Sequence, residues 1–81
     1  MLLADGFEDA YVGVAHVFNR AIAVYDLDKC IEVLIKRDGM GIEEATEYFE
    51  FNVLGAYMGK DTPAFLERLT LEETIERIQE A

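Results

Sequence analysis

The sequence predicts a small α+β fold, with a β-hairpin packed by two antiparallel helices and followed by a C-terminal helix. Residues 10–26 are rich in Val, Ile, Phe and Tyr, which is typical of strands. Residues 27–58 carry apolar residues at helical spacing. A chain of 81 residues suffices for one domain with a modest core, so residues 1–81 are taken as a single domain.

Residues 10–26 are predicted to form the hairpin, divided at Asn19-Arg20, because Asn tolerates the left-handed backbone that a tight turn needs. Alternation within each strand predicts large side chains on one face of the hairpin and small ones on the other. The small residues are Gly13, Ala15, Ala21 and Ala23. A face of small residues would leave room for a helix or for a second copy of the sheet.

Residues 27–37 are predicted to form the first helix. Asp26 can cap it by accepting hydrogen bonds from backbone N–H groups one turn in, and Gly39 can end it. The buried stripe has the spacing i, i+3, i+4, i+7. It consists of Leu27, Cys30, Ile31 and Leu34. Cys30 lies within this stripe, so we expect a buried, inert thiol, and a lone cysteine makes no internal disulfide.

Residues 42–58 are predicted to form the second helix, with negative charge in its first turn. Its expected core face consists of Ile42, Ala45, Phe49, Val53 and Ala56. The second half of this helix is apolar on every side, a pattern normally buried on two sides. Such a patch exceeds what a monomer usually exposes. The C-terminal helix or another chain could cover this patch. We expect another chain, with Phe51, Leu54 and Met58 forming a self-interface in a homodimer.

Residues 64–69 are predicted to form a short third strand, with a turn as the alternative, because Pro63 can lead into an edge strand or begin a short helix. Residues 70–80 are predicted to form the C-terminal helix, since Thr70 and Glu73 have capping-box spacing. This helix is too short to be stable alone and is expected to dock against another surface.

The net charge of −10 is uneven, at −3 over residues 1–40 and −7 over residues 41–81. Such a field argues against direct nucleic-acid binding and favours a basic protein partner. Glu43, Glu47 and Glu50 share one helix face, where like charges cost a few tenths of a kcal/mol per pair. This row could imitate nucleic-acid phosphates and bind a basic partner; a merely solvated face is the commoner interpretation.

Residue types limit the possible chemistry. The chain has no serine, so a Ser/His/Asp triad is excluded. His16 is expected in mid-strand and Cys30 in mid-helix, so we do not expect a catalytic pair. Four carboxylates near the ends of the hairpin could hold Mg²⁺ or Ca²⁺. They are Glu8, Asp9, Asp26 and Asp28. A small metal-dependent enzyme or binder is therefore the alternative to a protein without metal or cofactor.

The leading interpretation is a non-catalytic acidic interaction protein that forms a homodimer and binds another protein. A virion or assembly component, in which the apolar patch makes higher oligomers, is a further alternative. No apolar run approaches the length of a membrane span, and residues 1–10 lack the pattern of a signal peptide. We therefore expect a cytoplasmic protein without a membrane partner.

The run YDLDKCIEVLIKRDGMGIEEATEYFEFNVLGAYMG, followed by TPAF, resembles a family of short proteins from bacteriophages and related mobile elements. The resemblance covers roughly residues 5–66. The family has no assigned activity, so the resemblance implies no catalytic residues. It implies the cytoplasm of an infected bacterium, where many small acidic proteins bind host machinery.

Overall fold

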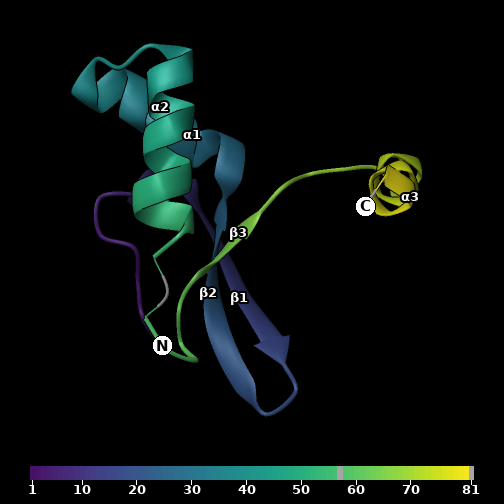
Figure 1. Cartoon of the computed structure of the whole chain (residues 1–81). Helices are drawn as coiled ribbons and strands as arrows, with labels where there is room; N and C mark the ends of the chain where they lie inside the picture. The colour runs from purple at the N-terminus through teal and green to yellow at the C-terminus, as the bar shows by residue number, and fades with distance from the viewer. Residues whose placement is uncertain (57, 81) are drawn as a thin grey trace.

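The computed structural model describes every residue except Tyr57 and Ala81. Its elements are η1 (Glu8–Ala10), β1 (Tyr11–Val17), β2 (Arg20–Asp26), α1 (Leu27–Asp38), α2 (Ile42–Phe49), η2 (Glu50–Leu54), β3 (Ala64–Leu66) and α3 (Leu71–Glu80). The helices α1 and α2 lie over one end of the sheet, the hairpin loop projects away from them, and α3 stands apart (Figure 1). The predicted α+β class and the layout of its helices and strands are confirmed.

The sheet has the order β1-β2-β3. The strand β1 pairs antiparallel with β2, whereas β3 pairs in parallel with β2, from Val24 opposite Ala64 to Asp26 opposite Leu66. A parallel neighbour needs a crossover connection, and α1 and α2 provide it. The predicted third strand is therefore present, although it is shorter than residues 64–69.

The hairpin register corrects the prediction about the two faces of the hairpin. The loop consists of Phe18 and Asn19, one residue earlier than predicted, and Val14 lies opposite Ala23. A two-residue loop pairs even-numbered residues with odd-numbered ones, and opposed residues share a face. Large residues of one strand therefore lie beside small residues of the other, and the prediction of one large face and one small face was wrong.

The helix α1 begins at Leu27 as predicted and ends at Asp38, one residue later than predicted. The carboxylate of Asp26 accepts a hydrogen bond from the backbone N–H of Lys29 at 3.0 Å. Gly39 adopts the left-handed conformation, with φ of 69°, and its N–H donates to the Ile35 carbonyl at 3.1 Å. This geometry favours glycine because it has no Cβ. Of the predicted stripe, Cys30 and Leu34 are fully buried and the other two residues are half-buried.

Aromatic side chains join the N-terminal segment, α2 and β3 in the core. The ring of Phe49 is fully buried and makes edge-to-face contacts with Phe65 and Phe7, at centroid distances of 5.1 and 6.3 Å. Such geometry suits the quadrupoles of the rings. The helical pattern predicted Phe49 as a core residue, whereas the two rings that meet it lie outside any helix.

The second helix differs from the prediction at its C-terminal end. The α-helical part ends at Phe49, and a π-helical turn, η2, continues to Leu54 in place of an α-helix to residue 58. Of the predicted core face, Ala45 and Phe49 are buried and Val53 is half-buried. Ile42, at the first position of α2, is 65% exposed, and Ala56 lies beyond the end of η2 and is also exposed. Both were wrongly predicted as core residues.

The C-terminal helix α3 begins with the predicted capping box. The backbone N–H of Glu73 donates to Thr70 Oγ1 at 3.1 Å, and the backbone N–H of Thr70 donates to Glu73 Oε1 at 3.0 Å. Its apolar stripe, however, is exposed. The helix itself stands apart from the rest of the domain (Figure 1) and does not dock on it. The stripe consists of Leu71, Ile75 and Ile78. No helix among the described residues is long and apolar enough to cross a membrane.

Candidate functional site

The four carboxylates considered as metal ligands do not converge. In the part of the chain that the structure describes, no three His, Cys, Asp or Glu side chains form a group that could hold a metal ion. Asp26, the only one of the four that is buried, is held by other groups. Its Oδ1 accepts from the Lys29 N–H, and its Oδ2 accepts from Arg68 Nε at 2.8 Å.

These two hydrogen bonds give Asp26 a structural role. The ion pair with Arg68, followed by the bond from the Lys29 N–H, holds the pKa of Asp26 below its usual value, although burial opposes this shift. Asp26 ends β2 and precedes α1, while Arg68 follows β3. The carboxylate therefore joins the start of a helix to a segment 42 residues further along the chain.

The thiol and the imidazole of this chain are not a catalytic pair. Cys30 is fully buried, and burial together with the nearby charge of Asp26 raises the pKa of its thiol to about 11. A thiol with this pKa stays protonated at neutral pH and is a poor nucleophile. His16 lies exposed on β1 and is not part of the buried core that contains Cys30.

The predicted acidic row is displayed on the outer surface of α2 and the start of η2. Glu43, Glu47 and Glu50 are all exposed. Among the described residues, no basic side chain lies within ion-pair distance of any of the three. The row is therefore a source of uncompensated negative charge at the surface.

The predicted apolar residues continue this row. Phe51 and Leu54 are 81% and 48% exposed, so neither α3 nor any other described element covers them. Residues four apart are neighbours on a helix surface, which places Phe51 beside Glu47 and Leu54 beside Glu50. We call these five residues, Glu43, Glu47, Glu50, Phe51 and Leu54, the acidic–apolar surface.

The π-helical turn accounts for how this surface ends. The N–H of Gly55 donates to the carbonyl of Glu50, five residues earlier, at 3.1 Å. A Cβ at Gly55 would lie 3.1 Å from that same oxygen and 3.3 Å from the carbonyl oxygen of Phe51. A glycine therefore suits the close approach that closes the turn. Single π turns within helices often mark functional sites.

An apolar hollow of about 380 Å³ lies between η2 and the N-terminal segment. Its lining includes Leu2, Leu3, Phe7, Val53, Met58 and Phe65. Met58, predicted as part of the self-interface, is 70% exposed at this hollow and follows η2 in the chain. The sequence showed no periodicity at Leu2 and Leu3, so their contribution to a surface beside η2 was missed.

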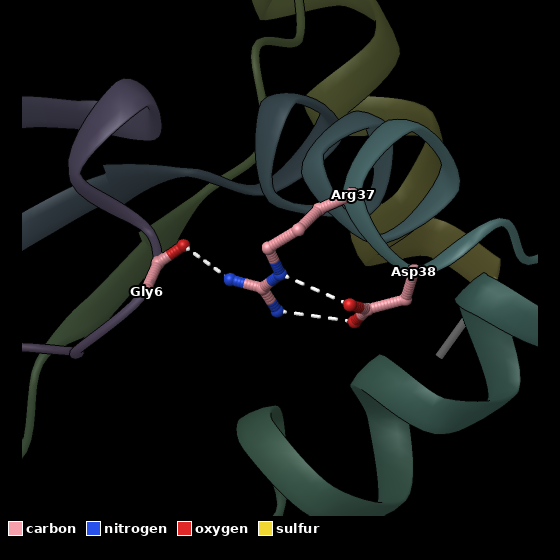
Figure 2. Close-up of polar contacts among 3 residues, drawn as sticks. All are labelled: Gly6, Arg37 and Asp38. Carbon is pink, nitrogen blue, oxygen red and sulfur yellow. Dashed lines mark hydrogen bonds and ion pairs between the residues drawn. The ribbon is translucent and has the colours of Figure 1, made fainter.

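Arg37 fixes the N-terminal segment that forms one wall of this hollow. Its guanidinium donates to both oxygens of Asp38, each at 3.1 Å, and to the carbonyl of Gly6 at 2.8 Å (Figure 2). It also lies over the ring of Phe7, 5.7 Å from the centroid. Arg37 thus ties α1 to residues 6 and 7. The hydrogen bonds from Arg37 lower the pKa of Asp38, which keeps the carboxylate charged.

A second hollow, of about 420 Å³, lies between α1 and the segment that contains Gly6 and Asp9. Lys29, Lys36 and Arg37 line it together with Asp9 and Glu32. Three basic and two acidic side chains share this lining, so the hollow presents no strong field of one sign to a ligand. The acidic–apolar surface remains the more distinctive feature.

Comparison of the chain with protein-family models, with curated proteins and with solved structures finds no match. The resemblance to short bacteriophage proteins stays a prediction.

Proposed function

We propose that this protein is a non-catalytic interaction protein whose acidic–apolar surface binds a basic surface of another protein. One observation carries the proposal. On a single helical face, three carboxylates without an ion-pair partner among the described residues border two large exposed apolar side chains, Phe51 and Leu54. Exposed apolar side chains beside charge of one sign are a common composition for a docking surface.

The two halves of this surface would have different tasks. Carboxylates at the rim steer a basic partner into place and make association depend on salt. An aromatic side chain that enters a pocket of the partner supplies most of the binding free energy, and Phe51 is the candidate for that role. The apolar hollow beside η2 offers space for a side chain of the partner in return.

A basic partner fits this surface better than a second copy does. In a two-fold dimer the same patch faces itself. Phe51 and Leu54 could then meet only if the rows containing Glu47 and Glu50 also approached each other, and like charges oppose that approach. Self-association through Phe51, Leu54 and Met58 stays a prediction.

In its specific form, the proposal makes the partner a nucleic-acid-binding protein of a bacterial host, in line with the resemblance to bacteriophage proteins. The row of Glu43, Glu47 and Glu50 would occupy the place of backbone phosphates in the partner's basic cleft. The partner would thereby be blocked without any chemistry by this chain. No metal, cofactor, membrane or direct nucleic-acid contact enters the proposal.

The test compares two variants of equal charge. The chain is immobilised and exposed to a bacterial lysate at low salt. One variant replaces the row on α2 (E43Q/E47Q/E50Q). The matched control replaces three exposed carboxylates on α3 (E72Q/E76Q/E80Q). Retained proteins are identified by mass spectrometry, and added double-stranded DNA serves as the competitor.

The expected result is a protein retained by the wild type and by the α3 variant, lost from the α2 variant, and released by DNA. Replacing Phe51 with Ser should also abolish retention while leaving the fold intact, because the ring is exposed. Unchanged retention by the α2 variant would refute the proposal. Equal losses from both triple variants would show that total charge matters and that the α2 surface does not.

A further inference from the structure

The outer edge of β1 is a second surface without a described neighbour. In the order β1-β2-β3, β1 has a partner on one side only. The loop of Phe18 and Asn19 makes Val17 and Arg20 a hydrogen-bonded pair, and hydrogen-bonded pairs alternate along the ladder. The N–H and C=O groups of Val14 and His16 therefore point away from β2. Such an edge is a template for pairing with another strand.

The edge lacks the usual protection against such pairing. Residues 13–17 contain no lysine, no proline and no acidic side chain. A register irregularity between Tyr11 and Gly13 interrupts only the N-terminal end of the strand. Val14 and Val17 are 45% and 42% exposed. Natural edge strands normally carry inward-pointing charges, prolines or bulges along their length.

The distribution of charge indicates which partner fits this edge. Residues 10–25 contain no Asp or Glu, although the whole chain has 17 of them. A chain with a net charge of −10 repels its own copies except where they meet through a surface without carboxylates. The hairpin is such a surface, and an edge strand is self-complementary under two-fold symmetry.

We propose that two copies of this chain associate through the outer edges of their β1 strands, joining two three-stranded sheets into one continuous sheet. This association leaves the acidic–apolar surface free for another protein, so it is independent of the function proposed above. It differs from the predicted self-interface on the second helix in both location and chemistry.

The two-fold axis of this dimer passes beside Ala15. With that register, Val14 and His16 of one copy exchange hydrogen bonds with His16 and Val14 of the other, and the two Ala15 residues face each other as a non-hydrogen-bonded pair. The pairing uses the regular part of β1, residues 13–17, and leaves out the irregular end. An axis at His16 would instead bring two imidazoles together, and an axis at Val14 would include the irregular end.

This register also gives Phe18 a contact. Phe18 is 99% exposed and has a φ of 55°, a left-handed conformation that a bulky side chain rarely adopts. A strained and exposed aromatic residue is costly in an isolated chain, and strain of this kind tends to occur at functional positions. In the dimer centred at Ala15, Phe18 of one copy lies just beyond the paired residues 13–17, next to the irregular N-terminal end of the other copy's β1.

The test introduces a cysteine on the proposed axis. An opposed non-hydrogen-bonded pair has a Cα separation of about 4.5 Å, which falls within the disulfide range. Ala15→Cys should therefore form a disulfide-linked dimer on mild oxidation roughly tenfold faster than the control Asn19→Cys, because pairing raises the effective thiol concentration. The native Cys30 is fully buried and does not compete. The readout is non-reducing gel electrophoresis over time.

Light scattering behind a sizing column gives an independent readout. The wild type should be a dimer. Val14→Lys, which places a charge at the edge, and His16→Pro, which removes an outward N–H, should both be monomers with unchanged far-UV circular dichroism. A wild-type monomer, or equal cross-linking by Ala15→Cys and Asn19→Cys, would overturn the proposal. If Val14→Lys and His16→Pro remain dimers while Phe51→Ser becomes a monomer, the self-interface lies on the second helix. That result would also overturn the proposal.

Discussion

Replacing Asp26 tests whether one carboxylate holds three parts of the fold together. The residue ends β2, caps α1 and binds Arg68 after β3. Asp26→Asn keeps an oxygen for the Lys29 N–H but removes the charge that Arg68 binds. Asp26→Ala removes both interactions. The two variants therefore separate the helix cap from the ion pair.

The structure sets the magnitude of each loss. A hydrogen bond between charged groups contributes about 1.5–3 kcal/mol, and exposed ion pairs contribute less. Because the Arg68 side chain is 64% exposed, we expect Asp26→Asn to lower the free energy of unfolding by about 1 kcal/mol. An N-terminal helix cap contributes about 1 kcal/mol more, so Asp26→Ala should cost about 2 kcal/mol in total.

The loss should also depend on pH. The pKa of Asp26 is lower in the folded chain than its unfolded value of 3.8. A carboxyl group of this kind stabilises the fold fully above its unfolded pKa and loses that contribution as the pH falls through its folded pKa. The difference between wild type and Asp26→Asn should therefore be complete at neutral pH and shrink once the pH falls below 3.8.

The assay is urea unfolding followed by circular dichroism, at neutral pH and at about pH 3. The double variant of Asp26→Asn with Arg68→Met provides the control. Arg68→Met should lower stability in the wild type and have almost no further effect beside Asp26→Asn, because its partner is gone. Equal losses for Asp26→Asn and Asp26→Ala, or an undiminished effect of Arg68→Met in the double variant, would refute the reasoning.

Three further predictions concern the core and the backbone. Phe49→Ala should lower the free energy of unfolding by about 3–5 kcal/mol and remove most of the cooperative thermal transition, because this ring joins α2 to β3. A shift of the melting temperature by only a few degrees would contradict that role. The buried thiol of Cys30 should resist alkylation until the chain unfolds, and rapid labelling of the folded chain would contradict its burial. Because the pKa of this thiol is raised in the folded chain, the free energy of unfolding should fall as the pH rises above 9.0 towards 11. Because Gly39 and Phe18 both have a left-handed backbone, Gly39→Ala should lower the free energy of unfolding by about 1 kcal/mol, and Phe18→Gly should raise that of the monomer by about 1 kcal/mol. Denaturant titrations at low protein concentration measure both changes, and changes of the opposite sign would contradict this reasoning.

Local signals in the sequence were sufficient for α1. Its cap at Asp26, its end at Gly39 and its buried stripe each depend on residues within one or two turns. The capping box at Thr70 and Glu73 was predictable for the same reason. These elements follow from short-range hydrogen bonding and helical spacing, which a sequence displays directly.

Features that depend on distant partners were not predictable. The bond between Asp26 and Arg68 spans 42 residues, and neither residue signals the other. Likewise, the contact of Phe65 with Phe49 depends on the parallel docking of β3. The hairpin faces were misjudged because the pattern within each strand was not combined with the pairing between strands.

The candidate site was predicted in part. The exposed row of Glu43, Glu47 and Glu50 followed from helical spacing, and Phe51 and Leu54 are exposed as the excess of apolar residues suggested. The π turn was not foreseen, because a change from four-residue to five-residue hydrogen bonding leaves almost no trace in an apolar pattern. That change explains why Ala56 does not belong to the core.

The parallel pairing of β3 imposes an order on folding. The hairpin closes across a two-residue loop, whereas β3 must meet β2 across a separation of 40 positions, from Val24 to Ala64. Closing the longer loop costs on the order of 2–3 kcal/mol more entropy, so we expect β3 to pair with β2 after the hairpin has closed. During synthesis, a chain that has been made only as far as α2 exposes both edges of its hairpin. The edge of β2 is covered only when residues 64–66 arrive, and Arg68 follows them to neutralise Asp26.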